Sequence, residues 1–288
     1  MSLLVFGLGY TAGAYARRAV AHQRVAGTVR SAERVRDFAG SGVDAMRFDG
    51  SEADPALLPA IEGAEQILVS AQPSPDGDPV LPRFQTAIEA APRLRTIVYL
   101  STIGVYGDHR GAWIDEATPP APQNERGRIR VGVENEWRAL GDRIGKAVHV
   151  LRLAGIYGPG RNALADLRAG EARRLDKPGQ VFNRIHVDDI GRTVAAAFAF
   201  KGEGAVWNVA DDEPAPAATV VEHAAALLDL PPPPLVAFEE AELSPMARSF
   251  YGANRRVGNR AIKDRLGVAL AFPTYREGLA ALRAAGEG

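Results

Sequence analysis

The sequence has no cysteine among its 288 residues, and this absence excludes several kinds of chemistry. Disulfide frameworks, thiolate metal sites and cysteine nucleophiles all need the missing side chain. Lysine is also scarce, because only Lys146, Lys177, Lys201 and Lys263 stand beside 30 arginines. An arginine at a position where a lysine is expected is therefore only weakly informative in this chain.

Long apolar runs and an excess of one charge are missing too. The start "SLLVFGLGY" lacks a cationic region and a cleavage site, and the later run "TVAAAFAF" (193–200) is far too short to cross a membrane. The net charge is −1, so no basic field favours nucleic acid or an anionic membrane. We expect a cytoplasmic protein with neither nucleic-acid nor membrane partners, and the sequence is compatible with a homodimer.

What the chain does contain is an alternation of apolar runs and helical patterns over its first 155 residues. The runs "LLVFG", "VAGTVR", "VDAMRF", "QILVSA", "RTIVYLS" and "VHVLRLAG" are typical of buried strands. Helices are expected in "TAGAYARRAVAH", around 80–91 and from near Arg126. Strands separated by helices of about ten residues predict a parallel sheet with right-handed crossovers.

A glycine-rich turn follows the first expected strand. In "VFGLGYTAGAYA", Gly7, Gly9 and Ala12 have G-x-G-x-x-A spacing at the start of a helix. The first glycine permits a tight turn, the second lets a pyrophosphate approach the backbone, and the alanine permits close packing of helix on sheet. The free N–H groups of the helix favour phosphate. The pattern predicts a dinucleotide site, with a ligand-free glycine turn as the alternative.

The second expected strand bears on which dinucleotide binds. NAD-binding versions of the motif place an acid about 20 residues on, where it holds the ribose 2′-OH. Residues 14–32 contain no Asp or Glu, and the strand ends in Arg30, followed by Ser31. A cation there suits a 2′-phosphate, so we expect NADP, with NAD as the alternative if Arg30 is a plain surface residue. Asp49 is expected to contact the adenine or to form a turn before Gly50.

Four more stretches, "LSTIGVYG" (100–107), "WIDEATPPAP" (113–122), "LRLAGIYGPG" (151–160) and "RIHVDDI" (184–190), complete a pattern that covers nearly the whole chain. With the glycine turn, they resemble the extended short-chain dehydrogenase/reductase family, the NAD(P)-dependent epimerases and dehydratases. The resemblance implies that the hydroxyl of Thr102 faces a substrate carbonyl. It also implies a Tyr-x-x-x-Lys pair on the next helix, with a glutamate four residues after the lysine.

The chain departs from the family at this pair. If Glu134 is that glutamate, Arg130 takes the lysine position and Arg126 the tyrosine position, and no tyrosine in the chain has a lysine four residues later. The family's tyrosine is a general acid/base, whereas arginine, with a pKa above about 12, keeps its proton. Arg130 is able to keep the lysine's hydrogen bond to the nicotinamide ribose, but Arg126 cannot replace the tyrosine.

Helical phase bears on where these arginines point. At about 100° per residue, Arg126, Arg130 and Trp137 fall within about 40° of one another, on the side of the apolar stripe. We therefore expect Arg126 and Arg130 to point inward as an anion clamp for a carboxylate or phosphate. The alternative is structural, with Arg130 paired with Glu134 at i,i+4 and Arg126 paired with another acid.

Any reaction would need another proton donor, and His109, just after the fifth expected strand, is the best candidate, unless it is a solvated loop residue. In "HVDD", helix capping explains the aspartates better than a metal site, so we expect no metal. The family's nucleotide-sugar members often carry an arginine four residues before the His of this motif, where this chain has Phe182; Arg184 is the nearest arginine. The expected catalytic set is Thr102, Arg126, Arg130 and His109.

The expected fold class is α/β: a Rossmann-type doubly wound parallel sheet with a small C-terminal substrate lobe. The dinucleotide domain is expected over 1–155, with 187–210 returning to it, and the lobe over 156–186 and 211–288. The expected cofactor contacts are Gly7, Gly9, Tyr10, Thr11, Ala12, Arg30, Ser31, Asp49, Ala71 and Arg130.

Two functions from different classes remain open. The first is an atypical epimerase, dehydratase or reductase acting on a small, oxygenated, anionic metabolite. The second is a redox-silent NADP(H)-binding sensor or regulatory protein, which the missing tyrosine favours. A coenzyme-independent isomerase or lyase is a third reading, which the intact glycine turn disfavours.

Overall fold

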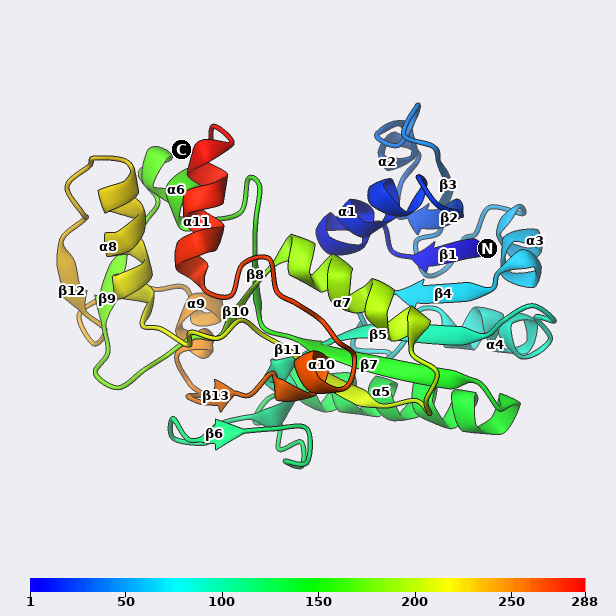
Figure 1. Cartoon of the computed structure of the whole chain (residues 1–288). Helices are drawn as coiled ribbons and strands as arrows, with labels where there is room; N and C mark the ends of the chain where they lie inside the picture. The colour runs from blue at the N-terminus through cyan, green and yellow to red at the C-terminus, as the bar shows by residue number, and fades with distance from the viewer. Residues whose placement is uncertain (288) are drawn as a thin grey trace. The chain divides into compact units, whose positions relative to one another are not determined.

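A seven-stranded sheet is the central feature of the computed structural model, which describes residues 1–287 (Figure 1). The strands lie in the order β11–β7–β5–β4–β1–β2–β3. Neighbouring strands from β3 to β5 in this order are parallel. The strand bounds are β1 (Ser2–Phe6), β2 (Arg24–Val29), β3 (Val43–Arg47), β4 (Gln66–Val69), β5 (Thr96–Thr102), β7 (Ala147–Leu153) and β11 (Val206–Val209). The expected α/β fold with a doubly wound sheet is confirmed, and its strand order reverses between β1 and β4, where such sheets bind ligands.

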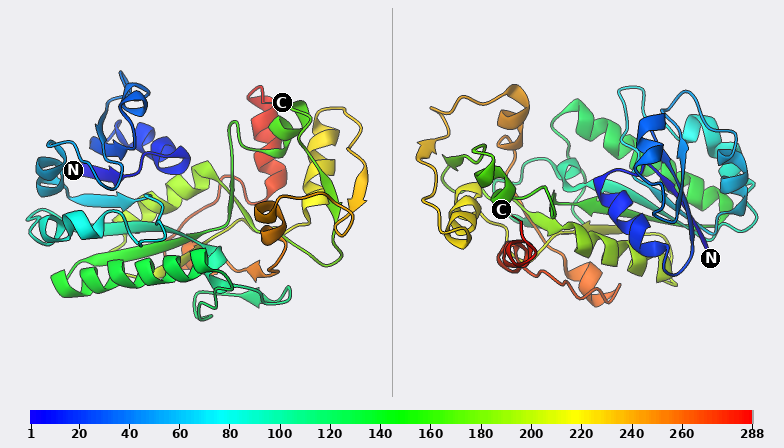
Figure 2. Two further views of the ribbon diagram at one scale, coloured as in Figure 1. Left: turned by 180° about the vertical axis from the view of Figure 1, so that it is seen from behind. Right: turned by 90° about the horizontal axis from the view of Figure 1, so that it is seen from above.

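Helices cover both faces of this sheet (Figures 1 and 2). On one face, α3 (Leu57–Gly63), α4 (Leu81–Glu89) and α5 (Glu125–Ile144) bury side chains in one core with the strands. On the other, α1 (Tyr10–Ala19) lies beside α7 (Val187–Ala199), where the ring centroids of Tyr15 and Phe198 are 6.5 Å apart. Because both faces are covered, the strands are nearly continuous apolar runs.

Local capping fixes the ends of α5, the helix that carries the unusual arginines. The side chain of Asn124 accepts a hydrogen bond from the Gly127 N–H at 2.8 Å, which satisfies a free donor of the first turn. Gly145 ends the helix at a φ of 64°, in the left-handed region that favours glycine. Within residues 1–287 no helix, α5 included, is both long and apolar enough to cross a bilayer.

The chain forms two compact units. The first comprises residues 1–105, 124–152 and 191–207, and the second comprises 106–123, 153–190 and the chain from Asn208 onward. Residues 106–123, which the sequence predicted within the first domain, thus fall in the second unit. The reason is local pairing, because β6 (Trp113–Ile114) forms a parallel ladder with β13 (Arg256–Val257).

The second unit combines short strand pairs with five helices among the described residues. Strand β8 (Gly155–Tyr157) pairs with β10 (Arg184–His186), and β9 (Arg174–Asp176) pairs with β12 (Leu235–Ala237). Its core includes Tyr157, Leu164, Val220, Tyr275 and Leu279. The remaining elements of the chain are α2 (Ala32–Arg36) and the 3-10 helix η1 (Ile103–Tyr106), and, in the second unit, α6 (Ala163–Arg168), α8 (Ala217–Leu227), α9 (Pro245–Phe250), α10 (Arg260–Asp264) and α11 (Tyr275–Ala284).

Candidate functional site

The glycine turn has the geometry that its motif predicts. Gly7 has a φ of +92°, and a Cβ added there would lie 2.8 Å from the backbone N of Ala71, so only glycine fits. Its N–H donates to Thr28 Oγ1 at 2.9 Å. Gly9 precedes α1, and no atom lies within 4 Å of a Cβ added there. The backbone at Gly9 is therefore open to a pyrophosphate, while Ala12 is fully buried beneath it.

A cavity of about 860 Å³ in the first unit opens over this turn. Five of the expected cofactor contacts line it: Gly7, Gly9, Arg30, Asp49 and Ala71. The others lie outside its lining. Tyr10, Thr11 and Ala12 form the first turn of α1, the Ser31 hydroxyl caps α2 by accepting from the Arg34 N–H, and Arg130 is on α5.

Three arginines, Arg30, Arg34 and Arg83, line the same cavity. Arg34 pairs with Asp37 at 2.5 Å, whereas Arg30 and Arg83 have no ion-pair partner within residues 1–287. Guanidinium groups without a protein acceptor suit a phosphate, to which they donate two parallel hydrogen bonds. The sequence identified Arg30 alone, because nothing in its local pattern relates Arg83 to the second strand.

Asp49 is occupied by its own turn. Its carboxylate accepts from the N–H groups of Ser51 at 2.9 Å and Glu52 at 2.8 Å, and from Arg47 Nη2 at 2.7 Å. The backbone donors, with the Ser51 hydroxyl and Arg47, hold the pKa of Asp49 below its usual range. These bonds favour the turn-forming interpretation of Asp49, and its contact with adenine stays a prediction.

Asp78 is a buried residue of the cavity that the sequence reasoning missed. Its carboxylate accepts from the N–H groups of Val80 and Leu81, both at 2.8 Å, and from Trp137 Nε1 at 3.0 Å. These bonds cap the start of α4 and fasten α5 to it. The signal was an aspartate just ahead of the helix "LPRF", a preferred capping residue.

Arg130 points inward as expected, but Arg126 does not. Arg130 is half-buried, and its Nη1 donates to the Tyr99 hydroxyl at 3.0 Å and to the Leu100 carbonyl at 3.2 Å. Arg126 is exposed in the first turn of α5, so the inward prediction for it is wrong. Side chains tilt toward the N-terminus of their helix, and one in the first turn therefore projects past the helix end. Arg126 and Arg130 do not form a shared clamp in this structure.

The i,i+4 alternative for Arg130 is also wrong, because Glu134 pairs with Arg152 of β7. Arg152 Nη2 lies 2.7 Å from Glu134 Oε2, and the two side chains are 6% and 3% exposed. The Ser101 hydroxyl donates to the other carboxylate oxygen. This buried group joins α5 to β7 and to the end of β5, next to Thr102.

Thr102, at the end of β5, donates its hydroxyl proton to no acceptor among residues 1–287. Its Oγ1 accepts from the Gly104 N–H at 3.0 Å, so the hydroxyl proton remains available to a carbonyl. Burial raises the pKa of Tyr99 on the same strand, and Arg130 partly opposes this shift. Tyr99 is fully buried in the core, so it offers no substitute for the family's tyrosine.

His109 lies in the second unit in a loop that is fastened to a distant segment. Its Nε2 is 3.1 Å from the Tyr106 carbonyl, and its backbone N–H donates to the Asn254 carbonyl at 2.9 Å. Asp108 in turn accepts from the Asn254 N–H at 2.7 Å. The half-buried imidazole thus takes part in loop packing, and its proposed acid role stays a prediction.

The "HVDD" segment has structural contacts. His186 Nδ1 accepts from the Asp188 N–H at 3.1 Å, and the Asp189 carboxylate accepts from the N–H groups of Ala271 and Phe272 at 2.7 and 3.0 Å. In the described part of the chain, no three histidine or acidic side chains gather into a potential metal site.

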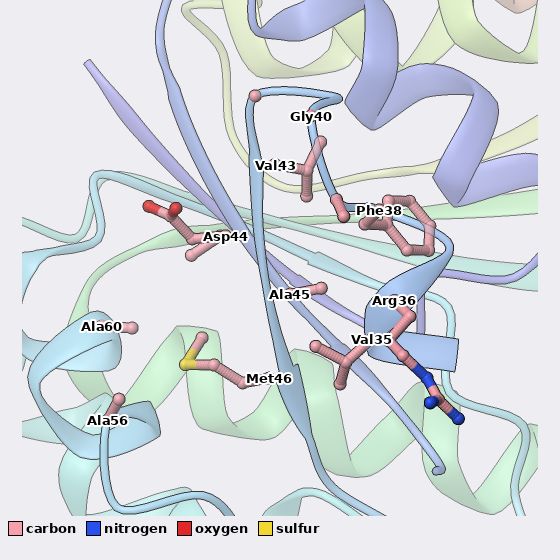
Figure 3. A pocket seen from close by; sticks show the side chains of 13 residues that line it. Val35, Arg36, Phe38, Gly40, Val43, Asp44, Ala45, Met46, Ala56 and Ala60 are labelled. Atoms are coloured by element: carbon pink, nitrogen blue, oxygen red, sulfur yellow. The ribbon is translucent and has the colours of Figure 1, made fainter. Parts of the chain in front are cut away.

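A second hollow of the first unit, of about 790 Å³, surrounds the edge strand β3. Figure 3 shows Val43 and Ala45 on one side of the strand and Asp44 and Met46 on the other, as strand alternation requires. Most of its lining is apolar, and Arg36 and Asp44 are its charged members. It brings together no catalytic constellation.

The sequence and the fold were compared with those of known proteins, and both have similar relatives. No family model matches the chain. A functionally unknown conserved protein from Silicibacter pomeroyi DSS is 46% identical, with a TM-score of 0.89 over 100% of this chain and 99% of that one. Protein YeeZ of Escherichia coli (strain K12) is 28% identical over 208 residues, 67% of this chain and 73% of that protein.

Two more distant structures share the fold. UDP-glucuronic acid 4-epimerase from Bacillus cereus, in complex with NAD, has a TM-score of 0.77 at 16% identity, over 98% of this chain and 95% of that one. dTDP-glucose 4,6-dehydratase from Bacillus anthracis str. Ames, in complex with NAD, has a TM-score of 0.73 at 17% identity, over 97% and 94%.

Proposed function

We propose that this chain, which shares its fold with an NAD-bound epimerase and an NAD-bound dehydratase, is a member of the extended short-chain dehydrogenase/reductase family and binds NADP(H) in the cavity of its first unit. One observation carries the proposal: the open backbone at Gly9 and the side chains of Arg30, Arg34 and Arg83 line one cavity. The glycine turn suits the pyrophosphate, and the arginines suit a 2′-phosphate, for which NAD has no equivalent. When bound, the dinucleotide would supply hydride chemistry.

We further propose that the protein is an atypical epimerase, dehydratase or reductase for a small, oxygenated, anionic metabolite. Thr102 supports this, because its hydroxyl proton is free to polarise a carbonyl. The inward guanidinium of Arg130, tied to Tyr99 and Leu100, would hold the nicotinamide ribose. The general acid would be a group other than the family's tyrosine, with His109 the candidate.

Fluorescence titration with NADPH and NADH tests the cofactor. The wild type should bind NADPH more tightly than NADH, and Arg30→Ala should weaken NADPH binding by about tenfold while leaving NADH unchanged, since a charge-assisted hydrogen bond is lost. Arg36→Ala is the matched control, because Arg36 is exposed at the end of α2, a few residues after Arg30, and does not line this cavity. Equal affinities of the wild type for the two dinucleotides would contradict the choice of NADP.

The competing function is a redox-silent NADP(H) sensor, which the missing tyrosine of the Tyr-x-x-x-Lys pair favours. A panel of carbonyl and hydroxy acids, followed at the nicotinamide absorbance, separates the two. Turnover that falls in Thr102→Val supports the enzyme. NADPH binding without turnover of any compound supports the sensor.

A further inference from the structure

A pocket of about 530 Å³ lies wholly within the second unit. Elements β8, β10, α6, α8, α9 and α11 contribute to its walls, and most of the side chains are apolar. Its size and lining are those of a small-molecule site, in which a few polar groups fix the orientation of the ligand. It shares no residue with the dinucleotide cavity.

Aromatic rings form a large part of this lining. Phe182 and Tyr251 meet edge to face, with ring centroids 5.0 Å apart. Phe250 on α9 also lines the pocket and is 65% exposed, although a ring of this size is normally buried. An exposed ring at the rim of an apolar pocket is typical of a ligand-binding surface.

Two polar groups of the pocket have unused hydrogen-bonding capacity. The Tyr275 side chain is 1% exposed, and its hydroxyl has no hydrogen-bond partner within residues 1–287. Such a buried hydroxyl is costly unless something pairs with it. Arg184 uses Nη1 for the carbonyls of Phe182 at 2.9 Å and Ala215 at 3.1 Å, and its other guanidinium nitrogens have no partner in the described chain. Its guanidinium carbon lies 5.9 Å from the centroid of the Tyr275 ring.

Arg184 has no ion-pair partner among the described residues, although Asp211 lies close enough to interact with its charge. Asp211 is buried and does not approach Arg184 within ion-pair distance, and burial raises the pKa of Asp211 to about 8, so this carboxyl is mostly protonated at neutral pH. Asp211 does not line the pocket; the charged lining residues beside Arg184 are Asp166, whose pKa burial raises, and two further arginines, Arg161 and Arg173. The pocket therefore has more arginines than carboxyl groups in its lining, and Arg184 and Tyr275 offer donors to an acceptor that carries negative charge.

We propose that this pocket recognises a small aromatic carboxylic acid, whose carboxylate binds Arg184 and Tyr275 and whose ring packs among Phe182, Phe250 and Tyr251. This inference depends on the proposed function in one respect: it takes the aromatic acid to be the substrate of the proposed enzyme. Phe182 contributes an aromatic ring to the pocket lining, and such a ring suits a planar ligand.

Isothermal titration with trans-cinnamate tests the proposal on the full chain without dinucleotide. The wild type should bind cinnamate. It should bind neither methyl cinnamate, which lacks the charge, nor cyclohexanecarboxylate, whose ring is saturated and not aromatic, with comparable affinity. Tyr275→Phe removes only the hydroxyl and should weaken binding about tenfold, as should Arg184→Gln. Arg260→Gln is the matched control, because Arg260 is exposed, pairs with Asp264 and lies outside the pocket.

Three results would overturn the proposal. They are no cinnamate binding by the folded wild type, equal affinity of wild type and Tyr275→Phe, and preferential binding of UDP-glucuronic acid over cinnamate with the same sensitivity to Arg184→Gln. Tyr275→Phe keeps the ring and its packing, so it remains informative if Arg184→Gln fails to fold. Failure of NADPH binding with cinnamate binding intact would refute the proposed function and leave this inference standing.

Discussion

Glu134 lies on α5, the helix that the family resemblance assigns to the active site. Its carboxylate pairs with Arg152, so this residue has a structural role in the fold. Both charges are out of water, and each is paired within the first unit. A buried ion pair contributes little net stability, but removing one partner leaves the other charge buried and uncompensated. The pair therefore constrains which substitutions β7 and α5 tolerate.

Glu134→Gln should lower the free energy of unfolding by about 3–5 kcal/mol, because the Arg152 guanidinium loses its counter-charge. Urea unfolding followed by circular dichroism measures this. Glu136→Gln, an exposed neighbour on the same helix, should change it by less than about 0.5 kcal/mol. Similar small effects for both variants would mean that water or another group compensates Arg152.

At the scale of elements, two glycines of α5 have opposite environments. A Cβ added at Gly141 would lie 2.4 Å from Val148 Cγ2 and 2.7 Å from the Lys146 carbonyl oxygen. One added at Gly132 would meet nothing within 4 Å. Helix propensity favours alanine over glycine at both positions, so packing alone distinguishes them.

Gly132→Ala should therefore stabilise the protein by about 0.5–1 kcal/mol, the propensity gain at an open site. Gly141→Ala should destabilise it by about 1–3 kcal/mol, because the methyl group must displace β7. Thermal unfolding of the two variants beside the wild type checks both signs. If both variants were stabilised, the turn after α5 would be looser than the structure has it.

The elements also show what could be predicted from sequence. Strands buried on both faces, such as β1 and β5, gave continuous apolar runs and were placed correctly, as was the start of α5 near Arg126. The short strands β6 and β13 were not predicted, because a two-residue ladder has no periodicity to detect. Gly7 and Arg30 were found because a turn and a strand end have local signatures, whereas Arg83, Asp78 and Tyr275 reach their cavities through tertiary packing.

At the scale of the whole molecule, each unit carries its own cavity, so the two proposed ligands should protect different parts of the chain. A ligand that binds only the native state, at a concentration of 100 times its Kd, stabilises that state by about 2.7 kcal/mol.

Hydrogen exchange followed by mass spectrometry resolves which segments each ligand protects. NADPH should slow exchange in 7–12, 28–34 and 70–83, which border the first-unit cavity. Trans-cinnamate should slow exchange in 155–163, 243–251 and 275–279. Protection of 243–251 by NADPH with 7–12 unchanged would contradict the assignment of the dinucleotide to the first unit.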